Sequence, residues 1–302
     1  MSMRLNSILK ATALGSLLAM VVIRPVHAVD GVIEINQARA FAGGVTLGDG
    51  AGFPVTISQP GSYRLTGNLD VTKMQNGQPQ ASPGNITAIE ITAENTTLDL
   101  NGFMILGPAV CSGAPPASQT TCSPSGSGKG VFASSANGVT VRNGTIQGMG
   151  STAIDIRGNA LVEHVRAINN GDGIFVRGGS IVRECIASSN AGDGISESGL
   201  GGIVVTNNIT IGNGGSGMNL GGEATVTGNT SSMNYFNGIT ANAGAAIIGN
   251  TARNNRTAAL AAGAATGYTN NVFNDNNGGV DPQVNGGTEM PPNICGGDLT
   301  CP

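Results

Sequence analysis

Between residues 130 and 280 the chain repeats itself with a period near 21 residues. In each repeat a Gly or Ala precedes an apolar residue, which recurs at Val131, Ile154, Ile174, Ile195, Met218, Ile239, Leu260 and Val280. The repeat is rich in Gly and lacks the helical spacing of apolar residues. This combination predicts a coil in which three short strands alternate with three turns.

Two kinds of column run in step with this repeat. A second apolar column contains Val162, Val182, Val205, Val226 and Ile247. Two columns of Asn lie five residues apart, one with Asn208, Asn229, Asn250 and Asn271, the other with Asn213, Asn234, Asn255 and Asn276. We interpret the Asn columns as corners, because Asn tolerates the left-handed backbone of a tight turn and stacked amides can hydrogen-bond from coil to coil.

The composition suits a solenoid better than an ordinary globular core. The chain has 302 residues, 49 Gly, no Trp, 3% aromatic residues and a formal net charge of -4. A solenoid buries thin aliphatic stacks and needs few aromatic residues. The regular apolar columns argue against disorder, which a high Gly content alone would allow. The 14 Lys and Arg residues are scattered, so nucleic acid is not expected as a partner.

The N-terminus has the pattern of a signal peptide. Arg4 and Lys10 precede an apolar run over 11–23, and Ala28 is a suitable residue before a cleavage site. We therefore expect a signal peptide over 1–28 and a secreted or periplasmic protein. The apolar run is too short for a stable membrane span. The sequence does not indicate an oligomeric state.

The cysteines agree with export. Four of the five form two close pairs along the chain, Cys111 with Cys122 and Cys295 with Cys301. Two short disulfides are the economical pairing in an oxidising compartment. Cys185 is left alone, at a corner position equivalent to Asn208. A zinc site is not expected, since His164 is the only His after the signal peptide.

The segments outside the regular repeat suggest two caps and one inserted loop. We expect an N-terminal cap over 29–52, in which Ile35, Ala38 and Phe41 indicate a short helix over 34–41 that covers the first coil. The solenoid is expected over 53–281, and an irregular tail over 282–302. The loop over 108–129 interrupts the solenoid and is either decoration or a wall of a substrate site.

Gly-Ile pairs at strand starts and the runs Thr97-Leu-Asp-Leu-Asn-Gly102 and Thr225-Val-Thr-Gly-Asn-Thr230 carry a family resemblance. Over 53–281 the chain resembles right-handed parallel β-helix proteins of the pectate-lyase-like superfamily, most closely the exported bacterial repeat proteins. The resemblance implies an all-β, right-handed parallel β-helix. This fold hosts lyases, hydrolases, epimerases and adhesins, so it does not imply one activity. The Asn-Thr-Asp, Asp-Asp and Gly-His-Gly motifs of polygalacturonase-like hydrolases and the Asp-Pro-His-Asp run of mannuronan epimerases are absent.

In this family the substrate groove commonly follows the strand that begins with the Gly-aliphatic pair. Strand alternation turns Asp155 and Arg157 outward, then Phe175 and Arg177 one coil later, followed by Ser196, Ser198 and Asn219. Because stacked coils lie about 4.8 Å apart, Asp155, Arg157 and Arg177 should be neighbours. They are our candidate catalytic group, with the two arginines clamping a uronate or sulfate. The alternative is a solvated charge ladder.

Glu197 is the fourth candidate catalytic residue. It falls in an inward column otherwise filled by Ile156, Val176, Leu220 and Ala241. A lone buried carboxylate is costly. We therefore expect the two extra residues of this coil to bulge the strand and turn Glu197 outward; the alternative is a special role for a buried acid.

Two other polar groups have both a functional and a corner interpretation. Beside Glu163, Arg183 and Glu184, His164 could act as a general base, but it occupies a turn position equivalent to Asn207. Asp172 and Asp193 resemble calcium ligands, yet each precedes a strand-starting Gly, where turn capping explains it better. No metal-binding or cofactor-binding residues are therefore predicted, and calcium stays open as a cofactor.

These observations lead to an exported β-helix protein that contacts a polysaccharide or cell-surface glycan along its lateral face. Two alternatives stay open. One is a polysaccharide lyase that acts by β-elimination through Asp155, Arg157 and Arg177. The other is a structural or adhesive surface protein without enzymatic activity.

Overall fold

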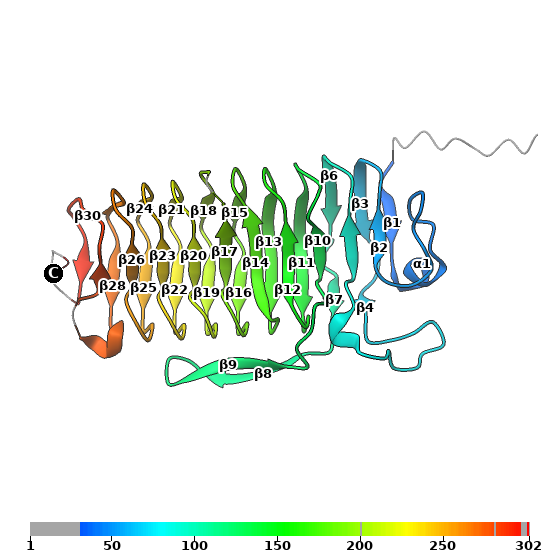
Figure 1. Ribbon diagram of the computed structural model, residues 1–302, viewed down its shortest axis with the longest axis horizontal. Coiled ribbons are helices and arrows are strands. Elements are labelled where there is room, and N and C mark those ends of the chain that lie inside the picture. Colours follow the sequence, from blue (N-terminus) through cyan, green and yellow to red (C-terminus); the bar gives the residue numbers. More distant parts are fainter. Residues whose placement is uncertain (1–30, 200, 281, 297–300, 302) are drawn as a thin grey trace, which may run out of the picture.

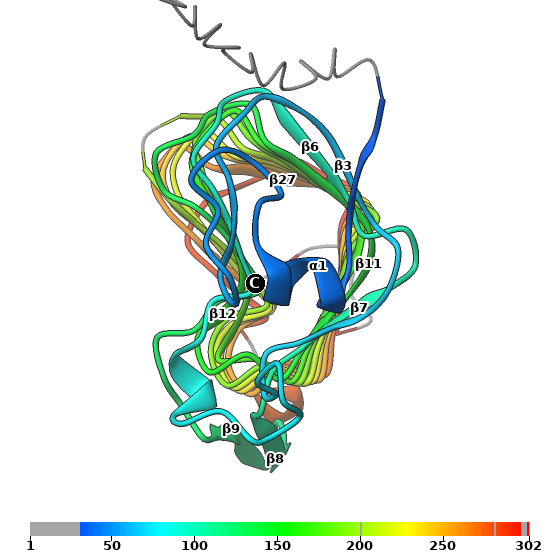
Figure 2. The ribbon, with the colours of Figure 1, turned by 90° about the vertical axis from the view of Figure 1, so that its right-hand side faces the viewer.

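The computed structural model describes residues 31–199, 201–280, 282–296 and 301, and shows a right-handed parallel β-helix (Figure 1). The expected fold class is therefore confirmed. Figure 2 looks along the coil axis and shows the successive coils superimposed. The predicted signal peptide, 1–28, lies outside the described residues. No helix in the described ranges is long and apolar enough to cross a membrane.

The first apolar column builds a parallel sheet, which we call sheet 1. Its strands within the described residues are β2 (Val55–Ile57), β5 (Ile89–Ile91), β10 (Val131–Ala133), β12 (Thr152–Ile156), β14 (Asp172–Arg177), β17 (Ile195–Ser198), β20 (Met218–Leu220), β23 (Ile239–Ala241), β26 (Leu260–Ala262) and β29 (Val284–Asn285). Successive members of the predicted column pair in register from Val131 to Leu260. The column ends with Val284, however, and not with Val280.

Val280 fails to enter the column because the last corner is longer than the others. The 3-10 turn η2 (Asn277–Gly279) lies before it, and Val280 is 61% exposed. Val284 is 7% exposed and pairs with Leu260. Between these valines, Gln283 turns its amide inward to Asn276. The additional residues thus allow Gln283 to finish the inner row of amides before the strand begins.

The other two strand positions of each coil form a second sheet, sheet 2. Its first column contains β1 (Ile33–Ile35), β3 (Gly61–Leu65), β6 (Thr96–Asp99), β15 (Ile181–Arg183), β18 (Val204–Thr206), β21 (Thr225–Thr227), β24 (Ala246–Ile248), β27 (Gly267–Thr269) and β30 (Thr288–Glu289). Its second column contains β4 (Leu69–Asp70), β7 (Met104–Leu106), β16 (Ile186–Ser188), β19 (Ile209–Ile211), β22 (Thr230–Ser232), β25 (Thr251–Arg253), β28 (Val272–Asn274) and β31 (Ile294–Cys295). Two longer strands, β11 (Thr140–Gln147) and β13 (Leu161–Ile168), belong to both columns.

The buried interior combines aliphatic stacks with two ladders of amide side chains. One ladder runs through Asn208, Asn229, Asn250, Asn271 and Asn293, the other through Asn170, Asn190, Asn213, Asn234, Asn255, Asn276 and Gln283. Each ladder Asn is at most 1% exposed. Its side-chain oxygen accepts from the backbone N–H and the amide of the preceding member, as Asn229 does from Asn208. Every buried amide group is therefore paired, which is the condition for placing polar groups inside.

The ladder residues themselves do not adopt the left-handed backbone that we expected of Asn. The residue before most of them does, with φ of 56° at Asn207, 65° at Gly228, 53° at Met233 and 55° at Asp275. The last member of each ladder, Asn293 and Gln283, follows a proline instead. The ladder Asn therefore has another physical role. It supplies an amide that bonds along the coil axis, while its predecessor makes the bend.

The expected short helix near the N-terminus is confirmed, but it follows a strand and does not begin at residue 34. Residues 33–35 form β1, which pairs with β3, and the helix α1 spans Gln37–Ala42. Asn36 sets this boundary, because its side-chain oxygen accepts from the N–H of Arg39 at 3.0 Å and caps the helix. Figure 2 shows α1 across the end of the coil. Ala40 is buried there, whereas Ala38 is exposed.

The loop over 108–129 contains an antiparallel hairpin, β8 (Val110–Ala114) and β9 (Ser118–Ser123). A 3-10 turn, η1 (Pro83–Asn85), lies earlier in the chain, before β5. Figure 1 shows the hairpin running along the side of the coil. The expected disulfides Cys111–Cys122 and Cys295–Cys301 are both present. At the C-terminal end, β29, β30 and β31 continue the two sheets beyond residue 281, where we expected an irregular tail.

Cys185 occupies a ladder position, as its sequence equivalence to Asn208 indicates. Its backbone N–H donates to the side-chain oxygen of Asn208 at 2.9 Å, and its thiol is 1% exposed. Burial raises the pKa of this thiol to about 12. Because the thiolate is the reactive form, Cys185 is a structural residue in the folded protein.

Candidate functional site

The outer face of sheet 1 carries one continuous row of side chains, one from each strand. In order along the coil axis they are Thr56, Glu90, Phe132, Asp155, Phe175, Ser196, Asn219, Thr240, Ala261 and Asn285. The predicted order of Asp155, Phe175, Ser196 and Asn219 is present. The row changes in character along its length, because its charged and aromatic members all precede Ser196.

Asp155 is the centre of a charge cluster on this row. Its Oδ1 lies 3.3 Å from Nη1 of Arg177, and its Oδ2 lies 3.6 Å from Nζ of Lys129. The pairing of Asp155 with Arg177 follows the predicted register. Lys129 was missed, because it closes the inserted loop and has no equivalent in the 21-residue repeat. Asp155 is 9% exposed, and two cations share its charge.

Two aromatic rings flank this cluster. The Lys129 ammonium lies 4.4 Å from the ring centroid of Phe132, and the Arg177 guanidinium lies 5.0 Å from that of Phe175. Both distances are within the range of cation–π attraction. Each cation is therefore held between a ring and Asp155, which limits the number of positions it can adopt.

A shallow pocket of about 550 Å³ opens at the end of these strands. Arg157, Arg177 and Ser198 line it, together with Asn137, Asn159 and the glycines at 158, 178, 179, 199, 201 and 202. The side chain of Arg157 is exposed and forms no hydrogen bond or ion pair with the described residues. The two arginines therefore present positive charge and N–H donors to one space, over a floor of backbone that has no side chains.

Glu197 lies behind this floor and does not point outward as we expected. Strand β17 continues the ladder without a bulge, with Val176 opposite Glu197 and Arg177 opposite Ser198. Glu197 is 9% exposed. The two extra residues of this coil lie in the connection over 199–203, which is longer than the corresponding connection over 178–180. Because the loop absorbs the insertion, the strand keeps its register and Glu197 keeps its inward direction.

The buried carboxyl of Glu197 is only half satisfied. Its Oε2 accepts from the backbone N–H of Gly221 at 2.6 Å, and a Cβ at position 221 would lie 2.0 Å from this oxygen. Its Oε1 is buried and has no hydrogen-bond partner among the described residues. Burial raises the pKa of this carboxyl, although the hydrogen bond from Gly221 partly opposes the shift. The neutral form is therefore favoured more in the folded chain than in the unfolded chain.

Replacing Glu197 with Gln is expected to make the protein more stable at neutral pH. When folding raises the pKa of a carboxyl, the free energy of unfolding falls as the pH rises from the ordinary pKa of 4.5 to the raised value. At higher pH this loss of stability stays constant. Gln has the same shape and no charge. Thermal unfolding from pH 4 to pH 8 should show a gap between the two proteins that widens with pH.

Glu223→Gln is the matched control for this series, because Glu223 is exposed. Its melting curve should follow that of the wild type at every pH. A Glu197→Gln protein that melts below the wild type at pH 8 would contradict a costly buried charge at this position.

The disulfide-closed hairpin does not wall the pocket of Arg157 and Arg177. Its residues are not among those that line that space in the described chain. Its side-chain hydrogen bonds go instead to Gly212 and Gly214 at the corner before sheet 1. Of the two interpretations of the loop, a wall for this pocket is therefore wrong.

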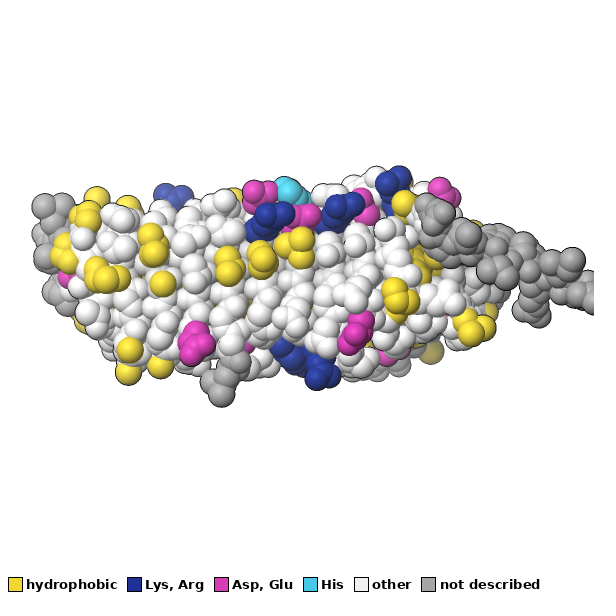
Figure 3. Space-filling view, turned by 90° about the horizontal axis from the view of Figure 1, so that it is seen from above, with side chains coloured by type: hydrophobic (Ala, Val, Ile, Leu, Met, Phe, Trp, Pro, Cys, Tyr) yellow, Lys and Arg dark blue, Asp and Glu magenta, His cyan; other side chains and the backbone are white. Residues whose placement is uncertain are grey.

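The polar group around His164 includes Glu163 and Arg183, which are part of a charge ladder on sheet 2. Cross-strand neighbours alternate in sign through Glu34, Arg64, Asp99, Arg142, Glu163 and Arg183. Arg183 and Glu163 approach to 2.6 Å, and Arg142 and Asp99 to 3.4 Å. Figure 3 shows acidic and basic side chains gathered along one edge of this face. Opposite charges at each step favour this register over one that places like charges together.

His164 is a corner residue beside this ladder. Its φ is 53° and that of its ion-pair partner Glu184 is 55°, and both precede ladder positions in the same way as Asn207. Their conformation supports the interpretation as a turn and gives no indication of a general base.

Asp172 and Asp193 cap turns, as their position before strand-starting glycines indicates. Asp172 Oδ1 accepts from the N–H of Asp193 at 3.2 Å, and Asp193 Oδ1 accepts from the N–H of Ser216 at 2.7 Å. Burial raises the pKa of Asp172. In the described part of the chain, no three His, Cys, Asp or Glu side chains are grouped so that they could hold a metal ion.

Comparisons with known proteins concern the fold. The family described as "Right handed beta helix region" matches residues 117–257. Among solved structures, the chain is similar to the Dettilon tailspike protein (gp208), with 14% identity over 80% of this chain and a TM-score of 0.45. It spans 57% of the length of that tailspike chain. It is also similar to DFA-IIIase from Arthrobacter chlorophenolicus A6.

The DFA-IIIase structure in complex with GF2 has 16% identity, with 86% of this chain and 81% of that one covered and a TM-score of 0.38. The complex with DFA-III has 14% identity, with 86% and 78% covered and the same TM-score. No curated protein matches the chain. At these identities and TM-scores the neighbours carry no functional argument, which must come from the residues of this chain.

Proposed function

We propose that this right-handed parallel β-helix binds an acidic polysaccharide or cell-surface glycan along the outer face of sheet 1. The row from Phe132 to Asn285 offers aromatic rings, hydroxyls and amides along the coil axis. A polymer can lie along such a face, because each coil repeats the same strand about 4.8 Å further on. The repeat thus provides an extended binding surface of the kind that solenoids use.

The observation that carries the proposal is the convergence of Arg157 and Arg177 on one open pocket. A guanidinium can donate two parallel hydrogen bonds to a carboxylate or sulfate, and two of them in one pocket favour an anionic ligand. Asp155 neutralises part of the charge of Arg177 and fixes its position, while Arg157 stays unpaired among the described residues. The rings of Phe132 and Phe175 add flat apolar surface for the C–H face of a sugar.

A lyase that acts by β-elimination is the second candidate function. Arg157 and Arg177 could neutralise the uronate carboxylate, and Glu197 has the raised pKa that a proton-transfer group needs. The position of Glu197 behind the backbone floor is less favourable, because a general base must reach the proton that it removes. Binding without turnover therefore agrees better with the observed arrangement.

A comparison of the affinities for acidic and neutral polymers tests the proposal. We expect the mature protein to bind polygalacturonate or alginate and to bind neutral dextran at least tenfold more weakly, with an affinity that falls as salt rises. Isothermal titration with each polymer measures both effects. A lyase would in addition produce an unsaturated product, seen as an absorbance rise during incubation with and without calcium. Equal binding of dextran and the acidic polymers would contradict the proposal, and no binding on a broad glycan array would favour a structural role.

Export agrees with this function, because a surface glycan lies outside the cytoplasm. The two disulfides support it, since such bonds persist in oxidising compartments. The intact mass of the protein recovered from periplasm or medium should correspond to a chain that starts at Val29.

A further inference from the structure

The hairpin of β8 and β9 is fixed to the side of the coil at several points. The Gln119 amide donates to Gly214 O at 2.9 Å, and the Thr120 hydroxyl donates to Gly212 O at 2.9 Å. The disulfide Cys111–Cys122 ties its two strands together at the other end. Its tip, at Pro116 and Ala117, is therefore held at a defined place above the corner.

The corner beneath the hairpin changes in composition where the hairpin ends. The residue after each Asn of the second ladder is small in the coils under the strands, namely Gly171, Ala191 and Gly214. A Cβ at Gly214 would lie 2.3 Å from the carbonyl oxygen of Ala191 in the preceding coil and 2.4 Å from that of Thr120 in the hairpin, so a larger residue fits against neither. In the next coils the same position holds Tyr235, Arg256 and Asn277. Large polar side chains thus begin where the hairpin no longer covers the corner.

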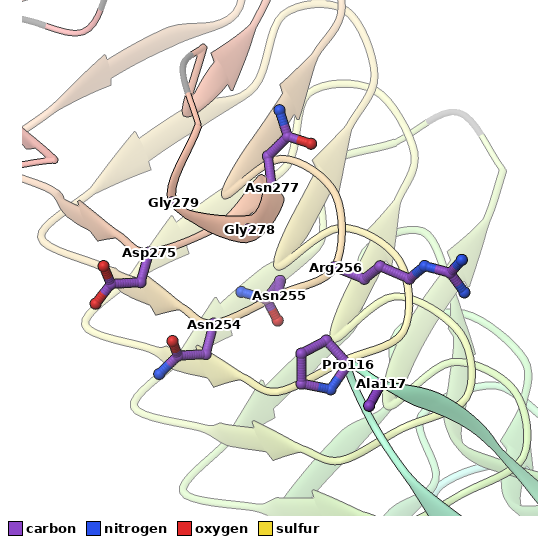
Figure 4. Close-up of a pocket in the computed structure, with 9 residues that line it drawn as sticks. All are labelled: Pro116, Ala117, Asn254, Asn255, Arg256, Asp275, Asn277, Gly278 and Gly279. Atoms are coloured by element: carbon purple, nitrogen blue, oxygen red, sulfur yellow. The ribbon is translucent and has the colours of Figure 1, made fainter.

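A hollow of about 620 Å³ lies between the hairpin tip and these coils (Figure 4). Its walls are Pro116 and Ala117 on one side and, on the other, Asn254, Asn255, Arg256, Asp275, Asn277, Gly278 and Gly279. This volume is within the range of about 300–1,000 Å³ that is typical of small-molecule sites. The hollow shares no lining residue with the pocket of Arg157 and Arg177.

Arg256 gives the hollow an oriented positive charge. Its guanidinium carbon lies 4.1 Å from the ring centroid of Tyr235, and its side chain is exposed. It forms no ion pair or side-chain hydrogen bond with the described residues, whereas Arg142, Arg177 and Arg183 all have carboxylate partners. Stacking on a ring fixes the plane of a guanidinium while its N–H edges stay free to donate.

Amides, one carboxylate and apolar groups occupy the rest of the hollow. Asn254 contributes an amide that can donate to and accept from hydroxyls, and Asn277, whose amide nitrogen already donates to Val280 O at 3.2 Å, contributes its side-chain oxygen and its second N–H. Asp275 lies on the other side of Asn254 and Asn255 from Arg256 (Figure 4), and its carboxylate already accepts from the amide of Asn274. Pro116 and Ala117 contribute apolar surface. A ligand that matches this arrangement has an anionic group at one end and hydroxyls at the other.

We infer that this hollow is a second binding site, which accepts a sugar unit that carries a carboxylate. The carboxylate pairs with the N–H edge of Arg256, and the hydroxyls bond to Asn254, Asn277 and Asp275. The C–H face of the sugar packs against the hairpin tip. The site is separate from the one on sheet 1 and does not depend on the function proposed there.

Tyrosine fluorescence gives a readout that belongs to this site alone. The chain has three Tyr and no Trp. Tyr63 and Tyr268 are 1% and 4% exposed, whereas Tyr235 is partly exposed beneath Arg256. Acrylamide, a neutral quencher, should therefore quench mainly Tyr235. Glucuronate is expected to protect it from quenching in a saturable manner, and glucose at the same concentration is not.

Two variants alter opposite walls of the hollow. Arg256→Ala should weaken the glucuronate effect at least tenfold, because a charge-assisted pair is lost. Ala117→Trp should weaken glucuronate binding to a similar degree, because the indole fills the hollow from the hairpin side. The fluorescence of this indole interferes with the tyrosine signal. The affinity of this variant is therefore measured by competition between unlabelled glucuronate and a fluorescent uronate. Arg253→Ala is the charge-matched control: this exposed arginine ends β25 and does not line the hollow, so the variant should bind as the wild type does.

Three results would overturn the inference, and a fourth would contradict the separateness of the site. They are wild-type affinity for glucuronate in a folded Arg256→Ala protein, equal protection by glucose, and equal protection by sodium sulfate alone, which would show an anion site without sugar recognition. Loss of the signal in Arg157→Ala would also count against a separate site. Far-UV circular dichroism verifies that each variant is folded.

Discussion

Replacing Arg177 with Ala is expected to weaken binding of an acidic polysaccharide by about ten- to one-hundred-fold, since hydrogen bonds to charged groups contribute about 1.5–3 kcal/mol. Arg177 combines a pocket position with contacts to Asp155 and Phe175, so its loss removes both a donor fork and the support of the aromatic face. Lys129 still balances Asp155 in this variant. Titration of the folded variant with the polymer measures the loss.

Arg157→Ala and Arg166→Ala provide the comparison for this result. Arg157 lines the pocket without contacts that support the fold, so its removal should weaken binding and leave the melting temperature unchanged. Arg166 is exposed on sheet 2 and controls for net charge. If Arg166→Ala weakens binding as much as Arg177→Ala does, the polymer responds to the overall charge and not to this pocket. Arg177→Lys should bind with intermediate affinity, because it keeps the charge and loses the fork.

Asn229→Ala is expected to lower the free energy of unfolding by about 3–5 kcal/mol, because about 1–3 kcal/mol is lost for each buried polar group left without a partner. The Asn229 oxygen accepts from the N–H of Asn208 at 2.8 Å and from its amide at 3.0 Å. Its own amide donates to Val205 O and to Asn250 Oδ1, both at 2.9 Å. Chemical denaturation followed by circular dichroism measures the change.

Asn242→Ala is the control, because Asn242 is exposed and its side chain makes no hydrogen bond with the described residues. It should change stability by no more than about 0.5 kcal/mol. Asn229→Asp separates the ladder bonds from packing, since it keeps the acceptor and places an oxygen opposite Val205 O and Asn250 Oδ1. It should be at least as destabilising as Ala. Stability within 1 kcal/mol of the wild type in both variants would show that the ladder contributes little.

The candidate site on sheet 1 could be predicted in part because strands obey a strict alternation. Once the repeat placed Ile154 and Ile174 inside, Asp155 and Phe175 had to point outward and to lie side by side. Lys129 could not be found in this way, since it belongs to the inserted loop. The predicted direction of Glu197 was wrong because two extra residues can enter either a strand or a loop. Here the strand keeps its backbone hydrogen bonds and the loop takes up the extra residues.

No motif or periodicity in the sequence predicted the hollow beside Arg256. Pro116 and Arg256 lie 140 positions apart, and no periodicity relates the hairpin to the corner. A partial signal was present in the small residues Gly171, Ala191 and Gly214, although of the two glycines only Gly214 has the hairpin among its close contacts. What packs there could be identified only from the structure.

The 21-residue repeat by itself determined the coil of three strands and three turns, the stacked columns and the paired amides, and the family resemblance implied its right-handed parallel class. It could do so because neighbouring coils are related by a constant offset along the chain, so local preferences for strand and corner are repeated in register. The near cysteines determined their disulfides for a similar reason, since short loops close easily. Tertiary structure alone decided where the irregular parts lie: Val284 in the last coil, Glu197 inward, Lys129 on Asp155 and the hairpin tip beside Arg256. These contacts join segments with no fixed spacing, and they depend on packing and hydrogen bonding that only the folded chain defines.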